Sequence, residues 1–195
     1  ATMSTAKILT LWADERVDEE AVRILRKSSL DIPVPMDSSG QKDIKTLVNA
    51  FIEMDNALGL AAPQIGISKR IVVFRNKGFG ERGQISGGNN YEVLINPRIT
   101  QARGEKVSAS EGCLSCPEIN VEVSRFPEIK VRAYDLTGRK INKRYTDFLA
   151  RIVQHEIDHL EGKLIVDYGG TVSFPRKREE FFTSLFYKTG EAGNV

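Results

Sequence analysis

The chain has 195 residues, of which 41% are hydrophobic, enough for one domain with a substantial core. No apolar run approaches the length of a membrane span, no charged-then-apolar signal segment opens the chain, and its two cysteines give no disulfide framework, so we expect a cytoplasmic protein with no membrane partner. A net charge of +2 argues against a nucleic acid as substrate.

The first regular pattern in chain order is helical. A helix is predicted from about residue 42 to about residue 56, because helical spacing relates the apolar residues Ile44, Leu47, Val48, Phe51 and Ile52. Two strands are predicted next, at residues 71–75 and 91–95. This mixture of helix and strand is consistent with an α+β fold.

The segment between these strands contains a glycine pattern. Residues 78–83, Gly-Phe-Gly-Glu-Arg-Gly, match the G-x-G-x-x-G pattern of dinucleotide-binding folds and do follow a strand. That pattern must also open a helix, and residues 84–90, Gln-Ile-Ser-Gly-Gly-Asn-Asn, are poor helix formers. We therefore reject dinucleotide binding and predict a flexible surface loop.

A strand, a hairpin and a second long helix follow. The strand is predicted around residues 121–123, and the hairpin has alternating apolar residues at Ile129, Val131 and Ala133 before a turn at 136–138. The helix is predicted to start after the N-cap Thr146 and to stop at Gly162. Its apolar residues cover much of its circumference, so we expect it to be largely buried.

Both histidines of the chain lie on this buried helix, at His155 and His159. Their spacing of four places both imidazoles on one side of the helix, with Glu156 beside them, in the zinc-hydrolase pattern HExxH. Burying two histidines without polar partners is costly, and a metal ion would remove that cost. Metal ligation is therefore the preferred interpretation over two hydrogen-bonded core histidines.

The third ligand decides between different functions. If Cys113 and Cys116 both bind, the site is a closed Cys2His2 structural zinc site in a non-enzymatic domain. If only one binds, a position stays open for water, and Glu156 favours this open, catalytic site. A third possibility is another HExxH metallopeptidase with Glu161 or Asp167 as ligand.

Three strings together resemble the peptide deformylase family. They are residues 59–64 (Gly-Leu-Ala-Ala-Pro-Gln), 111–115 (Glu-Gly-Cys-Leu-Ser) and 154–159 (Gln-His-Glu-Ile-Asp-His), and the resemblance extends from about residue 41 to about residue 168. It implies an α+β fold with antiparallel sheets around a central metal-binding helix. It also implies one catalytic domain over residues 1–195, with an expanded N-terminal segment (1–40) and a partly helical C-terminal extension (172–195).

The resemblance implies a role for each matching residue. The metal ligands would be Cys113, His155 and His159. The ion would be one divalent metal, often ferrous iron in this family, although Zn2+, Ni2+ or Co2+ suit the same donors. Glu156 would be the general base, and Gln64 with the backbone N–H of Leu114 would stabilise the oxyanion.

The resemblance also implies residues around the ligands. Gly59, Gly112 and Ile152 would lie against substrate, although core packing explains Ile152 equally well. A salt bridge between Glu111 and Arg125 would hold the cysteine loop, the alternative being an ordinary surface pair.

Two positions depart from the family pattern. Ala57 replaces a usual glycine, and Cys116 replaces a usual aliphatic residue. The implied reaction is removal of the formyl group from N-formylmethionyl peptides during protein biosynthesis, releasing formate. The ribosome is a possible partner through a C-terminal apolar stripe, Phe181, Phe182, Leu185 and Phe186, which would more usually pack on its own domain.

Overall fold

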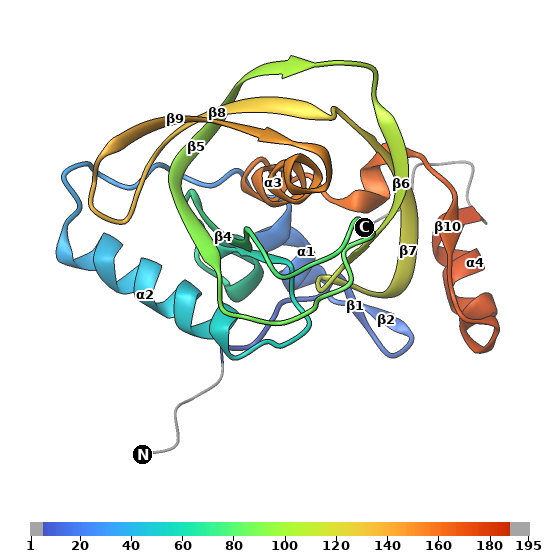
Figure 1. Cartoon of the computed structure of the whole chain (residues 1–195). Helices are drawn as coiled ribbons and strands as arrows, with labels where there is room; N and C mark the ends of the chain where they lie inside the picture. The colour runs from blue at the N-terminus through green and yellow to red at the C-terminus, as the bar shows by residue number, and fades with distance from the viewer. Residues whose placement is uncertain (1–5, 188–195) are drawn as a thin grey trace.

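Three antiparallel sheets and four α-helices form the part of the chain that the computed structural model describes, residues 6–187 (Figure 1). The strands are β1 (Trp12–Ala13), β2 (Arg16–Val17), β3 (Gly59–Ala61), β4 (Ile71–Arg75), β5 (Tyr91–Arg103), β6 (Val107–Cys113), β7 (Cys116–Arg125), β8 (Glu128–Tyr134), β9 (Lys140–Thr146) and β10 (Val172–Ser173). The α-helices are α1 (Glu19–Leu25), α2 (Ser38–Ile52), α3 (Asp147–Leu160) and α4 (Glu179–Tyr187). Three 3-10 helices are η1 (Ala62–Ile65), η2 (Ile165–Tyr168) and η3 (Arg176–Arg178).

The sheets are arranged around α3, which Figure 1 shows enclosed by strands. The largest sheet has the strand order β3-β4-β5-β8-β9, and a second sheet has the order β10-β7-β6. The β6–β7 hairpin pairs Val107 with Arg125 at its open end and Cys113 with Cys116 at its turn. The antiparallel α+β fold predicted from the sequence is confirmed.

The large sheet is buried on both faces at strand β4. Every residue of β4 is buried, and alternate residues point to opposite sides. Val72 and Phe74 join the core that contains α3, whereas Ile71 and Val73 join the core that contains α2. The continuous apolar run in this strand is therefore explained by helices on both sides, and it fixes α3 against the sheet.

Helix α3 has the limits that the sequence predicts. Thr146 is the N-cap, although its side chain makes no capping hydrogen bond. Gly162 has φ +73° and an added Cβ would lie 2.2 Å from the carbonyl oxygen of Arg26, so only glycine fits where the chain leaves the helix. The helix therefore ends just before the segment that packs on α1.

The limits of α2, β5 and β7 differ from those predicted from the sequence. The helix predicted at 42–56 is α2, which starts earlier because Asp37 caps it by accepting a hydrogen bond from Gly40 N–H. The strands predicted at 91–95 and 121–123 extend to Arg103 and over the whole of β7, because long-range pairing continues beyond their apolar residues. The strand at 71–75 was predicted correctly.

The loop of residues 76–90 contains no helix, in agreement with the rejection of dinucleotide binding. It forms an isolated bridge between Phe79 and Ile85, and the ring of Phe79 packs 5.7 Å from that of Phe148 on α3. Phe79 of this surface loop therefore packs on the core. The flexibility of the loop stays a prediction.

The C-terminal apolar stripe packs against the N-terminal segment. The Phe182 side chain is completely buried, 5.4 Å from the ring of Trp12, and Phe186 lies 6.0 Å from the same ring. The predicted helical extension is thus present as α4, and its residues 188–195 lie outside the described residues. No described helix has both the length and the apolar character needed to cross a membrane.

Replacing Phe182 by alanine should destabilise the fold. We expect a loss of about 3–5 kcal/mol in the free energy of unfolding, because the ring is removed from a filled core. Urea denaturation would measure it, with Tyr187→Ala as the control, since that ring is on the same helix and 60% exposed. Equal, small effects of the two substitutions would contradict the packing described.

Candidate functional site

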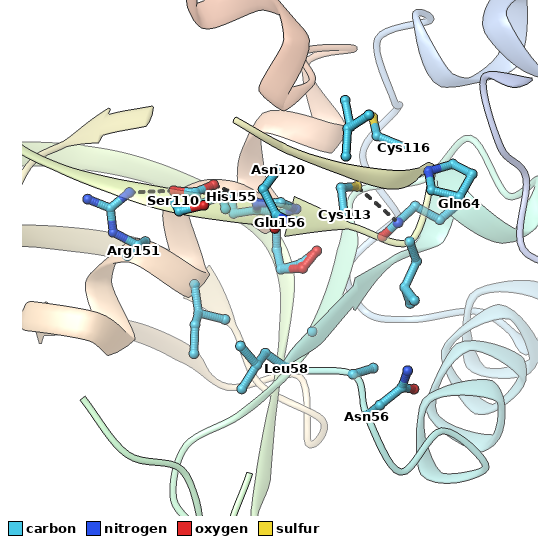
Figure 2. Close-up of a pocket in the computed structure, with 18 of the residues that line it drawn as sticks. Asn56, Leu58, Gln64, Ser110, Cys113, Cys116, Asn120, Arg151, His155 and Glu156 are labelled. Atoms are coloured by element: carbon cyan, nitrogen blue, oxygen red, sulfur yellow. Dashed lines mark hydrogen bonds and ion pairs between the residues drawn. The ribbon is translucent and has the colours of Figure 1, made fainter. Parts of the chain in front are cut away.

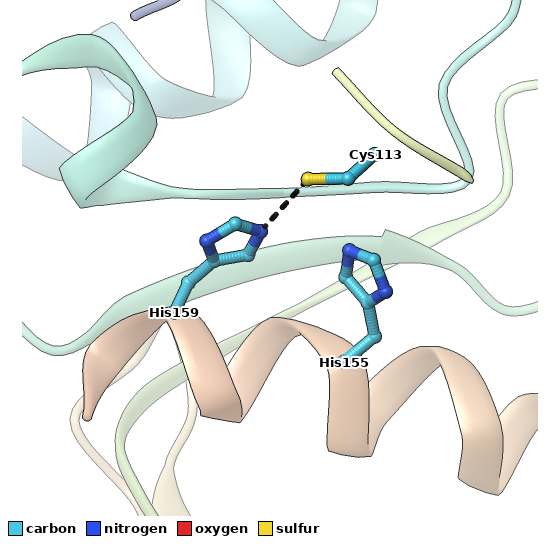
Figure 3. A group of neighbouring side chains, drawn as sticks. All are labelled: Cys113, His155 and His159. Carbon is cyan, nitrogen blue, oxygen red and sulfur yellow. Dashed lines mark hydrogen bonds between the residues drawn. The ribbon is translucent and has the colours of Figure 1, made fainter. Parts of the chain in front are cut away.

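Three potential metal ligands converge from two elements (Figure 3). Cys113 is the last residue of β6, and His155 and His159 lie one turn apart on α3. Their ligand atoms all lie within 4.8 Å of one another, and Cys113 Sγ is 3.4 Å from His159 Nε2. The close packing of the hairpin on α3 thus brings together a thiol and two imidazoles separated by more than 40 residues of sequence.

The donors fit a divalent metal ion. A thiolate and an imidazole bound to one tetrahedral zinc ion lie about 3.5 Å apart, given bonds of about 2.3 Å and about 2.0 Å. His155 Nδ1 lies 2.8 Å from Glu111 Oε1, which leaves Nε2 available for a metal. His159 Nδ1 is buried without a hydrogen-bond partner among the described residues, and the other nitrogen, Nε2, is the one that faces Cys113 Sγ.

The two cysteines differ in acidity. A hydrogen bond from the Cys116 thiol lowers the pKa of Cys113 well below its ordinary value, against the opposing effect of burial, and the charge of His159 lowers it further. The same contact and burial raise the pKa of Cys116. Cys113 is therefore the more acidic of the two thiols, and the deprotonated thiolate is the form that binds metals.

The arrangement favours an open site. Cys116 is not part of the group of converging ligand atoms in the described structure, although it pairs with Cys113 across the hairpin. Glu161 lies outside the group too, and accepts a hydrogen bond from Arg70 at 2.8 Å. Asp167 is likewise outside it and forms an ion pair with Arg26. Neither the closed Cys2His2 set nor a carboxylate third ligand is assembled.

Glu111 is the buried charge that joins the hairpin to α3. Its oxygens accept hydrogen bonds from Arg125 Nε (2.6 Å) and Nη2 (2.8 Å), from Arg151 Nη1 (2.6 Å) and from His155. Burial alone would raise the pKa of Glu111, but the hydrogen bonds from Arg125 and His155, with their charges, lower it to about 2. The Glu111–Arg125 pair is thus buried and is not a surface pair.

Arg151 is a member of this network that the sequence analysis missed. It also donates to the carbonyl oxygens of Val123 (2.8 Å) and Val107 (2.5 Å), on the two strands of the hairpin. Figure 2 shows its guanidinium directed at the carboxylate beside His155. The sequence feature that could have identified Arg151 is its position one turn before the first histidine, on a helix predicted to be buried.

Gln64 both closes a turn and faces the cysteine. Its Oε1 accepts a hydrogen bond from the Ala61 N–H at 3.0 Å, while Nε2 donates to Ser115 Oγ at 3.1 Å and lies 3.9 Å from Cys113 Sγ (Figure 2). The amide has two N–H donors, of which one donates to Ser115 Oγ and the other is directed at Cys113 Sγ, toward the candidate metal site. Leu114, the residue after the cysteine, lines the same cavity.

Glu156 lies over the backbone of β3. A Cβ added to Gly59 would be 2.5 Å from Glu156 Oε2, so a side chain there would displace the carboxylate. Burial raises the pKa of Glu156, although the charges of His155 and His159 oppose this effect. Ala57, the departure from the family pattern, is buried nearby, and its carbonyl oxygen accepts a hydrogen bond from Arg75 Nε at 2.9 Å.

These residues surround a cavity of about 630 Å³. Ile152 lies on its wall and also in the core around α3, so its core packing is confirmed and its contact with substrate stays a prediction. Leu58 and Phe148 add apolar surface, and Gly112 borders the opposite wall beside Asn120. The cavity therefore joins a polar, metal-fitting side to an apolar one, as ligand sites commonly do.

Comparison with known proteins identifies relatives of this site. The family model described as polypeptide deformylase matches residues 16–173. Peptide deformylase 2 of Rickettsia conorii is 35% identical, over 98% of this chain and 93% of that protein. Peptide deformylase of Rickettsia prowazekii is 40% identical, over 85% of this chain and 88% of that protein.

Solved structures agree with the sequence relatives. A peptide deformylase of Synechococcus elongatus, in complex with actinonin, has a TM-score of 0.69 and 28% identity, covering 98% of this chain and 90% of that one. A Met-Ala-Ser-bound peptide deformylase of Acinetobacter baumannii has a TM-score of 0.70 and 28% identity, covering 85% of this chain and 99% of that one. The fold is therefore shared across most of the chain.

Changing Glu111 to glutamine should destabilise the fold strongly. The substitution leaves two buried guanidinium groups without their carboxylate, so we expect a loss of about 3–5 kcal/mol. The matched control is Glu92→Gln, because Glu92 accepts a hydrogen bond from the half-exposed Lys143 at 2.6 Å and should lose only about 0–1 kcal/mol. Urea denaturation of the metal-free proteins would compare them, and similar losses would show that the network does not stabilise the fold.

Proposed function

Because the chain belongs to the polypeptide deformylase family, whose members are metal-dependent hydrolases that remove N-formyl groups, we propose that it acts on N-formylmethionyl peptides at the Cys113 site. The observation that carries the proposal is the convergence of Cys113, His155 and His159, of which Cys113 and His155 line one cavity together with the buried carboxylate of Glu156. The products are formate and a peptide with a free amino terminus.

The metal ligands in this proposal are Cys113, His155 and His159. Ferrous iron is the proposed native ion, and zinc, nickel and cobalt suit the same sulfur and nitrogen donors. A divalent ion held there would supply Lewis acidity, which lowers the pKa of a water molecule toward about 7. Glu111 holds His155 with Nδ1 engaged, so the ring presents Nε2 to the site.

Glu156 is the proposed general base. Its carboxylate takes a proton from the attacking water as the oxygen adds to the formyl carbon, and it returns that proton to the amine nitrogen as the C–N bond breaks. Burial, which raises its pKa, suits a group that must both accept and donate a proton near neutral pH. Gly59 leaves the space that this carboxylate occupies.

Gln64 and Leu114 are the proposed oxyanion donors. Gln64 is 2% exposed and held by Ala61 and Ser115, so its amide is already oriented before a substrate binds. The backbone N–H of Leu114 lies next to the cysteine ligand in the chain. Loss of one such donor typically slows turnover on the order of 100- to 1000-fold.

The apolar side of the cavity is the proposed methionine pocket. Leu58, Phe148 and Ile152 line it, and Gly112 on the facing strand lets substrate backbone approach closely. We place the whole chain in one catalytic domain and in the cytoplasm. We do not assign the C-terminal stripe to the ribosome, because Phe182 is buried against Trp12.

Changing Glu156 to glutamine should abolish turnover while metal is retained. Glutamine has nearly the same shape but cannot accept the proton, so we expect formate release from formyl-Met-Ala-Ser to fall by at least about 100-fold. Enzyme purified without oxygen would be assayed, with metal content measured in parallel. Turnover close to that of the unchanged enzyme would remove Glu156 from the mechanism.

The two cysteines should respond differently to serine. Cys113→Ser should lose bound metal and turnover, whereas Cys116→Ser should retain metal at about one ion per chain, because only Cys113 lies among the converging ligands. Metal analysis of the two matched variants would measure this. Equal metal loss from both would support the closed Cys2His2 site instead.

A further inference from the structure

Arg82 is carried to the cavity by the loop of residues 76–90. The loop is seated on the start of α3, since a Cβ added to Gly83 would lie 2.6 Å from Phe148 Cζ and 3.1 Å from Leu58 Cδ1. The N–H of Arg82 donates to Gln84 Oε1 at 3.1 Å, and the Arg82 side chain is exposed while lining the cavity. The backbone position of Arg82 is therefore restrained by the packing of the neighbouring Gly83, although Arg82 itself is exposed.

The other charged groups of the cavity are already engaged. Glu111 accepts hydrogen bonds from two arginines and His155, and Arg151 is one of those donors. Glu118 pairs with Arg178 at 2.9 Å. Glu156 is the buried proposed base. Among the described residues that line the cavity, Arg82 is the one cation with no ion pair.

The distance along α3 from the contact of this loop to His155 can be compared with the length of a bound peptide. Phe148, against which the loop packs, precedes His155 by seven residues on α3, or about 10 Å at 1.5 Å per residue. An extended peptide covers about 3.3 Å per residue, so this separation corresponds to about three residues. The loop that carries Arg82 thus contacts α3 about three extended residues away from His155, measured along the helix, so the residues after the methionine of a bound peptide are long enough to reach the Arg82 side of the cavity.

We propose that Arg82 determines substrate specificity by favouring formylated peptides that carry an aspartate or glutamate at the second or third residue. This inference rests on the proposed deformylase function and deepens it. A guanidinium binds a carboxylate with two parallel hydrogen bonds, and no carboxylate in residues 6–187 forms an ion pair with Arg82. Because the Arg82 side chain is exposed, we expect kcat/KM at low salt to be only about two- to five-fold higher for an acidic peptide than for the neutral one. This difference should decrease as added salt screens the charges.

The test compares kcat/KM for C-terminally amidated peptides, so that the side chain is the only added carboxylate. The substrates are formyl-Met-Ala-Ser, formyl-Met-Asp-Ser, formyl-Met-Ala-Asp and the corresponding lysine peptides. The variants are Arg82→Glu and the matched control Lys77→Glu, which makes the same charge change on an exposed residue of the same loop that does not line the cavity. Circular dichroism confirms that both variants are folded.

The unchanged enzyme and Lys77→Glu should prefer the acidic peptides, and Arg82→Glu should reverse that preference toward lysine. An unchanged preference in Arg82→Glu, or an equal fall for every peptide, would overturn the inference. Its failure is distinguishable from failure of the proposed function, because the latter would leave the neutral peptide without formate release in the unchanged enzyme.

Discussion

A buried carboxylate, Glu111, is the constraint on which the metal-fitting site depends. A buried charge is tolerated only with partners, and Glu111 obtains them from β7 through Arg125 and from α3 through Arg151 and His155. These contacts connect the β6–β7 hairpin to α3. The position of Cys113 at the end of β6 and the orientation of the His155 ring therefore follow from compensating one charge.

The large sheet fixes the position of α3, and with it the histidines and Glu156. Its strand β4 is buried by α2 on one face and α3 on the other, so α3 cannot shift without disturbing both cores. Gly59 on the neighbouring strand β3 leaves room for the Glu156 carboxylate. The proposed ligands, the proposed base and the cavity wall are thus attached to packed elements, and this suits electrostatic catalysis, which requires preorganised groups.

The features that the sequence predicted well depend on local spacing. The limits of α3 follow from its apolar pattern and Gly162, and the four-residue spacing of His155 and His159 specifies a shared face of the helix wherever that helix packs. Cys113 was a candidate, but only the hairpin register and its contact with α3 separate it from Cys116. That separation depends on long-range packing, which spacing along the chain does not encode.

Arg151 and the loop of residues 76–90 illustrate what local patterns miss. An arginine on a buried helix has no evident role until the strands that accept its hydrogen bonds are placed. The glycines of the loop match a nucleotide-binding pattern, yet Gly83 is required because Phe148 leaves no room for a side chain. The same residue type at the same spacing therefore has a packing cause here, and that contact is what brings a free cation, Arg82, to the cavity.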